Sequence, residues 1–225
     1  MGCAVLALVL PGHVISTPSR SSAMQHSGQP TPRAPDFAAQ EASADVRQMA
    51  DWVMGQSDHQ GRPFVIVDKV RVSVFVFHPD GKLIGASAAL MGSAQGDDSV
   101  SGIGEREMSA ILPHERTTPA GRFVSQPGRN LQGEDLIWLK HSEGLAIHRL
   151  RPGGRQEQRA QRLASSTPQD NRISLGCVVV PVAFYHSVVA PFIGKNLSVV
   201  YVLPETLPVQ TLFGALDRHL AAGAF

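Results

Sequence analysis

The chain has 225 residues, of which 43% are apolar and 6% aromatic, and its formal net charge is +1. This length suits one sizeable domain with a leader or tail. The near-zero charge and scarce aromatics exclude a strongly electrostatic or base-stacking surface, so we expect no nucleic-acid partner. No run approaches the ~20 apolar residues of a membrane span, so we expect no transmembrane segment.

Residues 1–23 predict a secretory signal, although no basic residue precedes its apolar run. The run covers residues 3–10 (CAVLALVL), and small residues at 21–23 offer a cleavage site. Residues 24–36 are rich in Pro and Ser and predict a disordered linker. The alternative is a disordered tail that carries an apolar patch by chance. Export would place the protein in the periplasm or cell envelope.

The sequence holds two cysteines, Cys3 and Cys177, and removal of the leader would take the first. An exported protein with one remaining cysteine cannot form an internal disulfide, and a free thiol there is prone to oxidation. Two interpretations of Cys177 remain, an inert buried thiol and a reactive nucleophile.

Residues 37–60 predict an N-terminal helix, because Ala42, Val46, Met49 and Val53 recur at helical spacing, with an end at Gly55. Residues 61–205 are β-rich and predict one domain. Within it, strands are expected at 64–68, 70–77, 82–90, 135–140, 145–150, 172–180 and 197–203, with a hairpin turn at 78–81.

Pro181 suits the first turn of a helix over residues 182–192. Residues 206–225 predict a C-terminal tail or short helix. The fold class is therefore mainly β (β-rich α+β), a single domain with one or two packed helices. Residues 92–104 form a glycine-containing loop without the Gly-Lys-Ser/Thr of a phosphate site. The histidines are scattered, so we expect no metal and no cofactor.

Cys177 follows Gly176 within an apolar run, and His148 lies in the run 145–150. Strand alternation places Leu145 and Ile147 on one face and His148 on the other. A cysteine nucleophile needs a base or cation nearby, because an ordinary thiol is mostly protonated at neutral pH. The pair Cys177 and His148 is therefore a candidate catalytic site, weighed against a core cysteine and an unrelated half-buried histidine.

Three motifs occur in a family-like order: Thr117-Thr-Pro-Ala-Gly-Arg-Phe123, Ile147-His148, and Ser174-x-Gly-Cys177. Together they resemble the L,D-transpeptidase (YkuD-type) catalytic domain over residues 64–203. The resemblance implies an L,D-transpeptidase-like β-sandwich that acts on peptidoglycan stem tetrapeptides without a cofactor.

In the implied mechanism, Cys177 attacks the carbonyl before the terminal D-Ala and forms a thioester. His148 would act as general base and acid. The backbone around Gly176 and Cys177 would stabilise the oxyanion, with Ser174 in a supporting role. The acyl group would pass to a stem-peptide amine, a free D-amino acid or water.

The sequence departs from that family at two neighbours of the cysteine. Leu175 stands where many members have histidine, and Val179 where they usually have Asn or Arg. The separation of His148 and Cys177 is also longer than in many members.

That longer segment is rich in arginine. We predict Arg149 and Arg172 as substrate-binding residues, because arginine binds carboxylates in a bidentate manner. A basic lid is one interpretation of the segment, and a solvated loop is the other. Its further arginines are Arg151, Arg155, Arg159 and Arg162.

Two alternatives to an active L,D-transpeptidase stay open. A catalytically degenerate member that binds cell wall is favoured by Leu175 and Val179. A sortase-like cysteine transpeptidase would need an arginine beside the cysteine, whereas three valines follow Cys177. Oligomeric state is not predicted.

Overall fold

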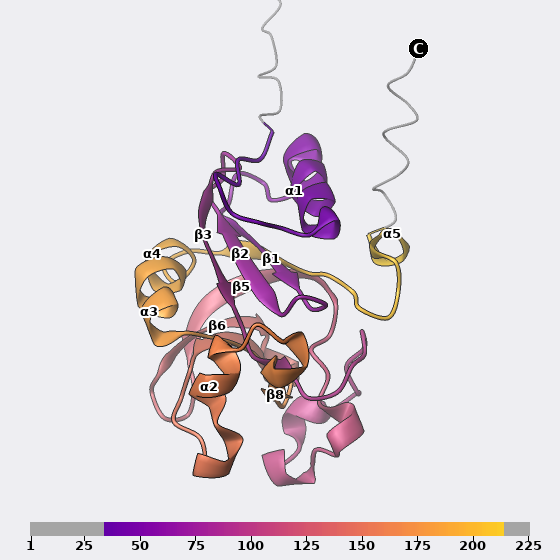
Figure 1. Cartoon of the computed structure of the whole chain (residues 1–225), viewed down its shortest axis with the longest axis vertical. Helices are drawn as coiled ribbons and strands as arrows, with labels where there is room; N and C mark the ends of the chain where they lie inside the picture. The colour runs from indigo at the N-terminus through magenta and orange to yellow at the C-terminus, as the bar shows by residue number, and fades with distance from the viewer. Residues whose placement is uncertain (1–33, 214–225) are drawn as a thin grey trace, which may run out of the picture. The chain divides into compact units, whose positions relative to one another are not determined.

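The computed structural model describes residues 34–213, which fold around one strongly curved β-sheet (Figure 1). This confirms the predicted mainly β class. The strands are β1 (Phe64–Asp68), β2 (Ser73–Phe77), β3 (Leu83–Ala88), β4 (Met91–Gly92), β5 (Gly121–Arg129), β6 (Asp135–Lys140), β7 (Leu145–Arg149), β8 (Arg172–Ser174), β9 (Val178–Val180) and β10 (Ser198–Val202). The helices are α1 (Ala44–Gln56), α2 (Arg159–Ala164), α3 (Val182–Phe184), α4 (Ala190–Phe192) and α5 (Val209–Leu212), with a π-helical turn (Tyr185–Val189) between α3 and α4.

Eight strands form the main sheet in the order β3-β2-β1-β10-β5-β6-β7-β9, while β4 pairs with β8. The pairs β1–β10 and β7–β9 are parallel. Leu90, just beyond β3, exchanges two backbone hydrogen bonds with Val179 of β9, at 2.7 and 2.8 Å. Because β3 and β9 are the two edges, this bridge nearly closes the sheet on itself.

The inner face of the curved sheet holds one apolar core. Strands from both ends of the order contribute to it, among them Val74, Val76, Ile147, Val178 and Val180. Side chains of β2 and β9 can meet only if the sheet curls. Burial of these β-branched residues on one face therefore drives the closure.

Helix α1 covers the outer face of β1, β2 and β10 (Figure 1). Its Ser43 cap accepts a hydrogen bond from the Val46 N–H at 3.2 Å and donates one to Asp68 Oδ2 at 2.7 Å, which ties the helix start to β1. Phe64 lies beneath the helix and stacks on Phe77, with ring centroids 4.7 Å apart.

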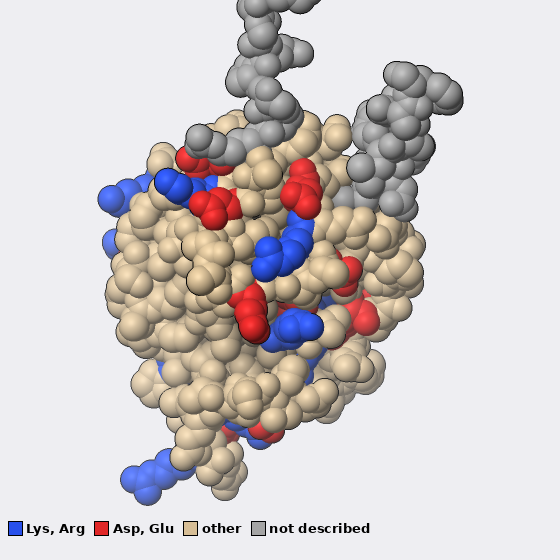
Figure 2. Space-filling view, turned by 45° about the horizontal axis from the view of Figure 1, so that its top comes forward, with Lys and Arg blue, Asp and Glu red and all other residues tan. Residues whose placement is uncertain are grey.

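Charged side chains of both signs are interspersed on the face seen in Figure 2, between broad uncharged areas. This face carries no extended field of one sign. The distribution agrees with the net charge of +1.

Several predicted elements differ in extent from the structure, among them the N-terminal helix and the strand predicted at 172–180. The N-terminal helix begins at Ala44, because Ser43 caps it, and the preceding segment is non-helical with Phe37 buried. It also continues past Gly55 and ends at Ser57 in the left-handed conformation. The strand predicted at 172–180 is two strands, β8 and β9, with a turn between them.

Strand β5 was not predicted from the sequence. This strand contains Pro127 and Gly128, which lower strand propensity, and its inward and outward residues do not alternate in hydrophobicity. The strand has nine residues. Residues 121–125 pair antiparallel with β10, and residues 126–129 pair antiparallel with β6.

The predicted secretory signal and residues 24–33 of the predicted linker lie outside the described residues. At the end of the linker, the Asp36 N–H donates to Gly81 O at 2.9 Å. In the predicted tail, Val209 of α5 and Phe213 directly after it belong to the same apolar cluster as α1. No helix in residues 34–213 is long and apolar enough to cross a membrane.

We expect Phe64→Ala to lower the free energy of unfolding by about 3–5 kcal/mol, because it removes a fully buried ring between α1 and the sheet. Urea denaturation measures the change. Leu131→Ala is the control, since Leu131 is fully exposed and its truncation should change little. Equal losses in the two variants would contradict this account of the α1 layer.

Candidate active site

Cys177 lies in the tight turn that joins β8 to β9. Ser174 braces this turn from within: its Oγ donates to Cys177 O at 2.7 Å and accepts from the Gly176 N–H at 3.1 Å. Ser174 is itself buried. Its side chain thus supports the backbone that presents the thiol.

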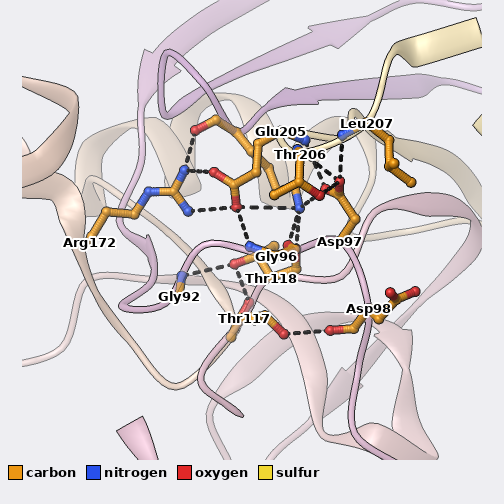
Figure 3. Close-up of polar contacts among 12 residues, drawn as sticks. Gly92, Gly96, Asp97, Asp98, Thr117, Thr118, Arg172, Glu205, Thr206 and Leu207 are labelled. Carbon is orange, nitrogen blue, oxygen red and sulfur yellow. Dashed lines mark hydrogen bonds and ion pairs between the residues drawn. The ribbon is translucent and has the colours of Figure 1, made fainter. Parts of the chain in front are cut away.

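Gly176 must be glycine for two reasons. Its φ is +141°, and an added Cβ would lie 2.7 Å from Thr117 O. Thr118 adds a direct link, since its Oγ donates to Gly176 O at 2.8 Å and accepts from the Gly92 N–H at 2.9 Å (Figure 3). The Thr-Pro motif therefore docks on the turn that carries Cys177.

The Gly176 N–H was predicted to help stabilise the oxyanion. That N–H already donates to Ser174 Oγ, so in this arrangement it is engaged within the turn. The contribution of Gly176 is conformational, because it allows the close approach of Thr117.

The Cys177 thiol is half-buried and donates a hydrogen bond to Gly144 O at 3.3 Å. Burial raises its pKa above the ordinary value. A hydrogen bond from the Ala146 backbone and the positive charge of Arg151 act in the opposite direction and do not offset it. The thiol is accordingly protonated at neutral pH.

His148 lies in β7 and is buried. Its Nδ1 lies 2.8 Å from Arg149 O, and because a carbonyl only accepts, we assign the proton to Nδ1 and leave Nε2 as an acceptor. Burial lowers the pKa of the imidazole to about 4. The bond to Arg149 O raises it, while the charges of Arg151 and Arg159 lower it further. His148 is therefore neutral near pH 7.

The parallel pairing of β7 with β9 brings together the segments that carry the predicted pair. His148 is in register with Val179. Cys177 lies in the turn two residues before Val179, and its thiol contacts Gly144 O, just before β7. Ile147 points into the core, as predicted. Within the described residues no hydrogen bond joins the thiol to the imidazole, since Cys177 donates to Gly144 instead.

The packing of Val179 explains why the position two residues after the cysteine is apolar in this protein. Its side chain is 1% exposed and packs with Leu90 and with Leu163 of α2. The inserted segment thus covers β9 through apolar contacts. Leu175, the other departure, is half-buried in the turn.

A buried lysine that the sequence did not single out organises the loops behind the turn. Lys69 Nζ donates to Gly96 O and Asp97 Oδ1, both at 2.6 Å, and to Thr118 O at 2.8 Å, with Glu205 Oε1 at 3.6 Å (Figure 3). Its side chain is 0% exposed. The available signal was a lysine placed inside a run of β-branched residues.

Asp97 is the main anionic partner of Lys69. It also accepts from the backbone N–H groups of Glu205, Thr206 and Leu207. Burial raises the pKa of its carboxyl, but the hydrogen bonds from Lys69, Thr206 and the backbone outweigh this and hold it at about 2. The Asp97 carboxyl is thus ionised at neutral pH.

The two arginines predicted to bind substrate are both engaged inside the protein. Arg172 donates to Lys69 O at 2.6 Å and pairs with Glu205 through both terminal nitrogens. Its guanidinium therefore belongs to the lysine network. Arg149 lies 3.5 Å from Glu134 and over the Tyr185 ring.

A groove of about 670 Å³ opens beside the pair, lined by residues 150–155 and 158–161 and by Val182. Cys177 and His148 do not line it. Arg151 and Arg159 do, and their charges reach the imidazole. Within residues 34–213, no three His, Cys, Asp or Glu side chains gather where they could hold a metal ion.

No family model and no curated protein matches this chain. Among solved structures, it is similar to L,D-transpeptidases of Xylanimonas cellulosilytica (17% identity, TM-score 0.37, 63% of this chain and 60% of that one) and Mycobacterium smegmatis (13%, 0.38, 63% and 58%). It is also similar to the helical cell shape determining protein Pgp2 of Campylobacter jejuni (14%, 0.40, 81% and 65%). The similarity covers 58–65% of the length of these three proteins.

We expect Gly176→Ala to destabilise the protein more than Gly133→Ala does. Both glycines have positive φ, but an added Cβ meets the Thr117 backbone at Gly176 and nothing within 4 Å at Gly133. The control should lose about 1–2 kcal/mol from its backbone conformation alone. Urea denaturation gives the two values, and equal losses would show that the contact with Thr117 is not tight.

The depressed pKa of His148 predicts a loss of stability in mild acid. Its pKa is about 4 in the folded protein against an ordinary 6.5, so the unfolded chain binds the proton more readily as the pH falls. The stabilisation present above the unfolded value should shrink by about 2 kcal/mol between roughly pH 7 and roughly pH 5. Urea denaturation at both pH values tests this, with His148→Gln expected to lack that part of the change. The same pH slope in both proteins would refute it.

Proposed function

We propose that this protein is an exported, cysteine-dependent L,D-transpeptidase that acts on peptidoglycan stem tetrapeptides. The observation that supports the proposal is the parallel pairing of β7 with β9, because His148 lies in β7 and Cys177 lies in the turn just before β9. The bracing of the cysteine turn by Ser174 and Thr118 supports it. So does the order of the three sequence motifs.

The chemistry follows from the protonation states. Cys177 carries a proton and His148 offers Nε2 as an acceptor, so an ion pair is not the resting state. Proton transfer from Sγ to Nε2 then accompanies attack of sulfur on the substrate carbonyl carbon. Substrate entry must displace the thiol from Gly144 O.

The tetrahedral intermediate collapses as its C–N bond breaks. His148 gives the proton to the leaving amine of D-Ala, and the acyl group stays on Cys177 as a thioester. Of the two backbone donors predicted for the oxyanion, we retain the Cys177 N–H, because the Gly176 N–H is engaged by Ser174. An acceptor amine or water then attacks the thioester, with His148 again taking the proton.

A catalytically inactive protein that binds cell wall is the second candidate. Two observations favour it: the raised pKa of the Cys177 thiol, and the hydrogen bond of that thiol to Gly144 O in place of the imidazole. The two candidates make opposite predictions for turnover.

The deciding measurement is incubation of the purified mature protein with tetrapeptide muropeptides and a free D-amino acid, followed by mass spectrometry. We expect loss or exchange of the terminal D-Ala and a thioester adduct on Cys177. Cys177→Ala should abolish both. His148→Gln should lower the rate by about 10²–10⁴-fold, the usual contribution of a general base.

Ser142→Ala is the matched control, because Ser142 lies in the turn before β7 and has no role in the proposed chemistry. It should turn over like the wild type. Binding of muropeptide without any turnover, in protein that is folded by circular dichroism, would reject the enzyme and leave the wall-binding candidate.

A further inference from the structure

The groove beside the reacting pair is lined by both apolar and cationic side chains. Leu150, Pro152, Ala160 and Val182 supply apolar surface. Three arginines also line it, Arg151, Arg155 and Arg159. The groove therefore suits a ligand that has both an aliphatic part and a negative charge.

The guanidinium groups of these three arginines are only partly engaged by other groups of the protein. Arg155 is exposed, and its guanidinium has no hydrogen-bond or ion-pair partner within residues 34–213. Arg159 pairs with Glu157 at 2.7 Å. Arg151 lies 2.7 Å from Glu134 Oε2, yet its buried Nε makes no hydrogen bond of acceptable geometry. Two of the three guanidinium groups are thus incompletely satisfied.

The groove is close to the reacting pair along the chain. Leu150 and Arg151 follow directly from β7, which carries His148, and Val182 follows β9 by two residues. Val182 lies five positions after Cys177, which corresponds to about 16 Å of extended chain, and arginine side chains reach back across part of that span. A peptide whose carbonyl meets Cys177 would place a group two or three residues away in the groove.

We infer that this groove binds a free carboxylate carried by the peptide substrate two or three residues from the reacting carbonyl, with Arg155 as its principal contact. The inference rests on the proposed function, because the ligand is part of that substrate. Arginine is suited to this role, since its planar guanidinium binds a carboxylate through two parallel hydrogen bonds.

Position in the fold favours these arginines over the two predicted from sequence. Arg172 is committed to Glu205 and the Lys69 carbonyl. Strand β9 supplies no charge, because its residues, Val178–Val180, are all valines. The cations beside the pair therefore come from the segment that joins β7 to β8.

The test measures binding separately from turnover, in the Cys177→Ala protein. Isothermal titration calorimetry compares a stem tetrapeptide with free side-chain and α-carboxylates against the same peptide with those groups amidated. We expect the acid form to bind about tenfold more tightly, and added salt to reduce the difference. Arg155→Ala should remove most of that preference, and Arg155→Lys should restore part of it.

Arg71→Ala is the matched control. Arg71 is also exposed, its side chain has no partner in the described part of the chain, and it does not line the groove. This variant should keep the full preference for the acid peptide. Circular dichroism checks that each variant is folded, which the exposure of Arg155 leads us to expect.

Equal affinity for the acid and amidated peptides would overturn the inference, as would an unchanged preference in Arg155→Ala. The proposed function can fail separately: binding with the arginine-dependent preference but no turnover by the wild-type protein would remove the enzyme and keep the groove. If the wild-type protein turns over substrate and Arg155→Ala leaves the KM unchanged, the proposed enzymatic function stands and the proposed binding of a carboxylate in the groove is rejected.

Discussion

The buried ammonium of Lys69 is the constraint on which the rest of the site depends. Removing an ion from water costs several kcal/mol unless charge and hydrogen bonds replace the lost hydration. Lys69 meets that requirement with acceptors from three loops, at Gly96–Asp97, Thr118 and Glu205. These loops are far apart in the sequence. Because the ammonium is 0% exposed, each loop must keep its acceptor in place, and their mutual arrangement is fixed.

The geometry of Cys177 follows from this charge through two short connections. Thr118 accepts from Lys69 with its carbonyl and donates to Gly176 with its hydroxyl. Arg172, in the strand before the turn, donates to the Lys69 carbonyl and pairs with Glu205. The turn and the strand that precedes it are thus both anchored to the Lys69 cluster. A reactive thiol on a loop gains from such anchoring, since small displacements of a nucleophile cost much of its rate.

Sequence patterns predicted the parts that depend on neighbouring residues. Strand β6 has the predicted bounds, and Ile147 points inward by simple alternation. The lysine cluster was not predicted from the sequence. A lysine at a strand end normally reaches solvent, and the partners of Lys69 lie far along the chain. The partners of Arg172 were missed for the same reason, since Glu205, which pairs with its guanidinium, lies far along the chain. Motif order suggested the pair Cys177 and His148, whereas the parallel pairing of β7 with β9 is not encoded by any local pattern.

The arginine segment between those two strands links binding to chemistry. Arg151 and Arg159 disfavour the imidazolium form of His148, whereas Arg151 favours the thiolate of Cys177. A carboxylate held in the groove would neutralise part of this positive charge. This would raise the pKa of the imidazole and make His148 a stronger base. The loss of positive charge near the thiol would raise the pKa of Cys177 as well, so the thiol would stay protonated until His148 takes its proton.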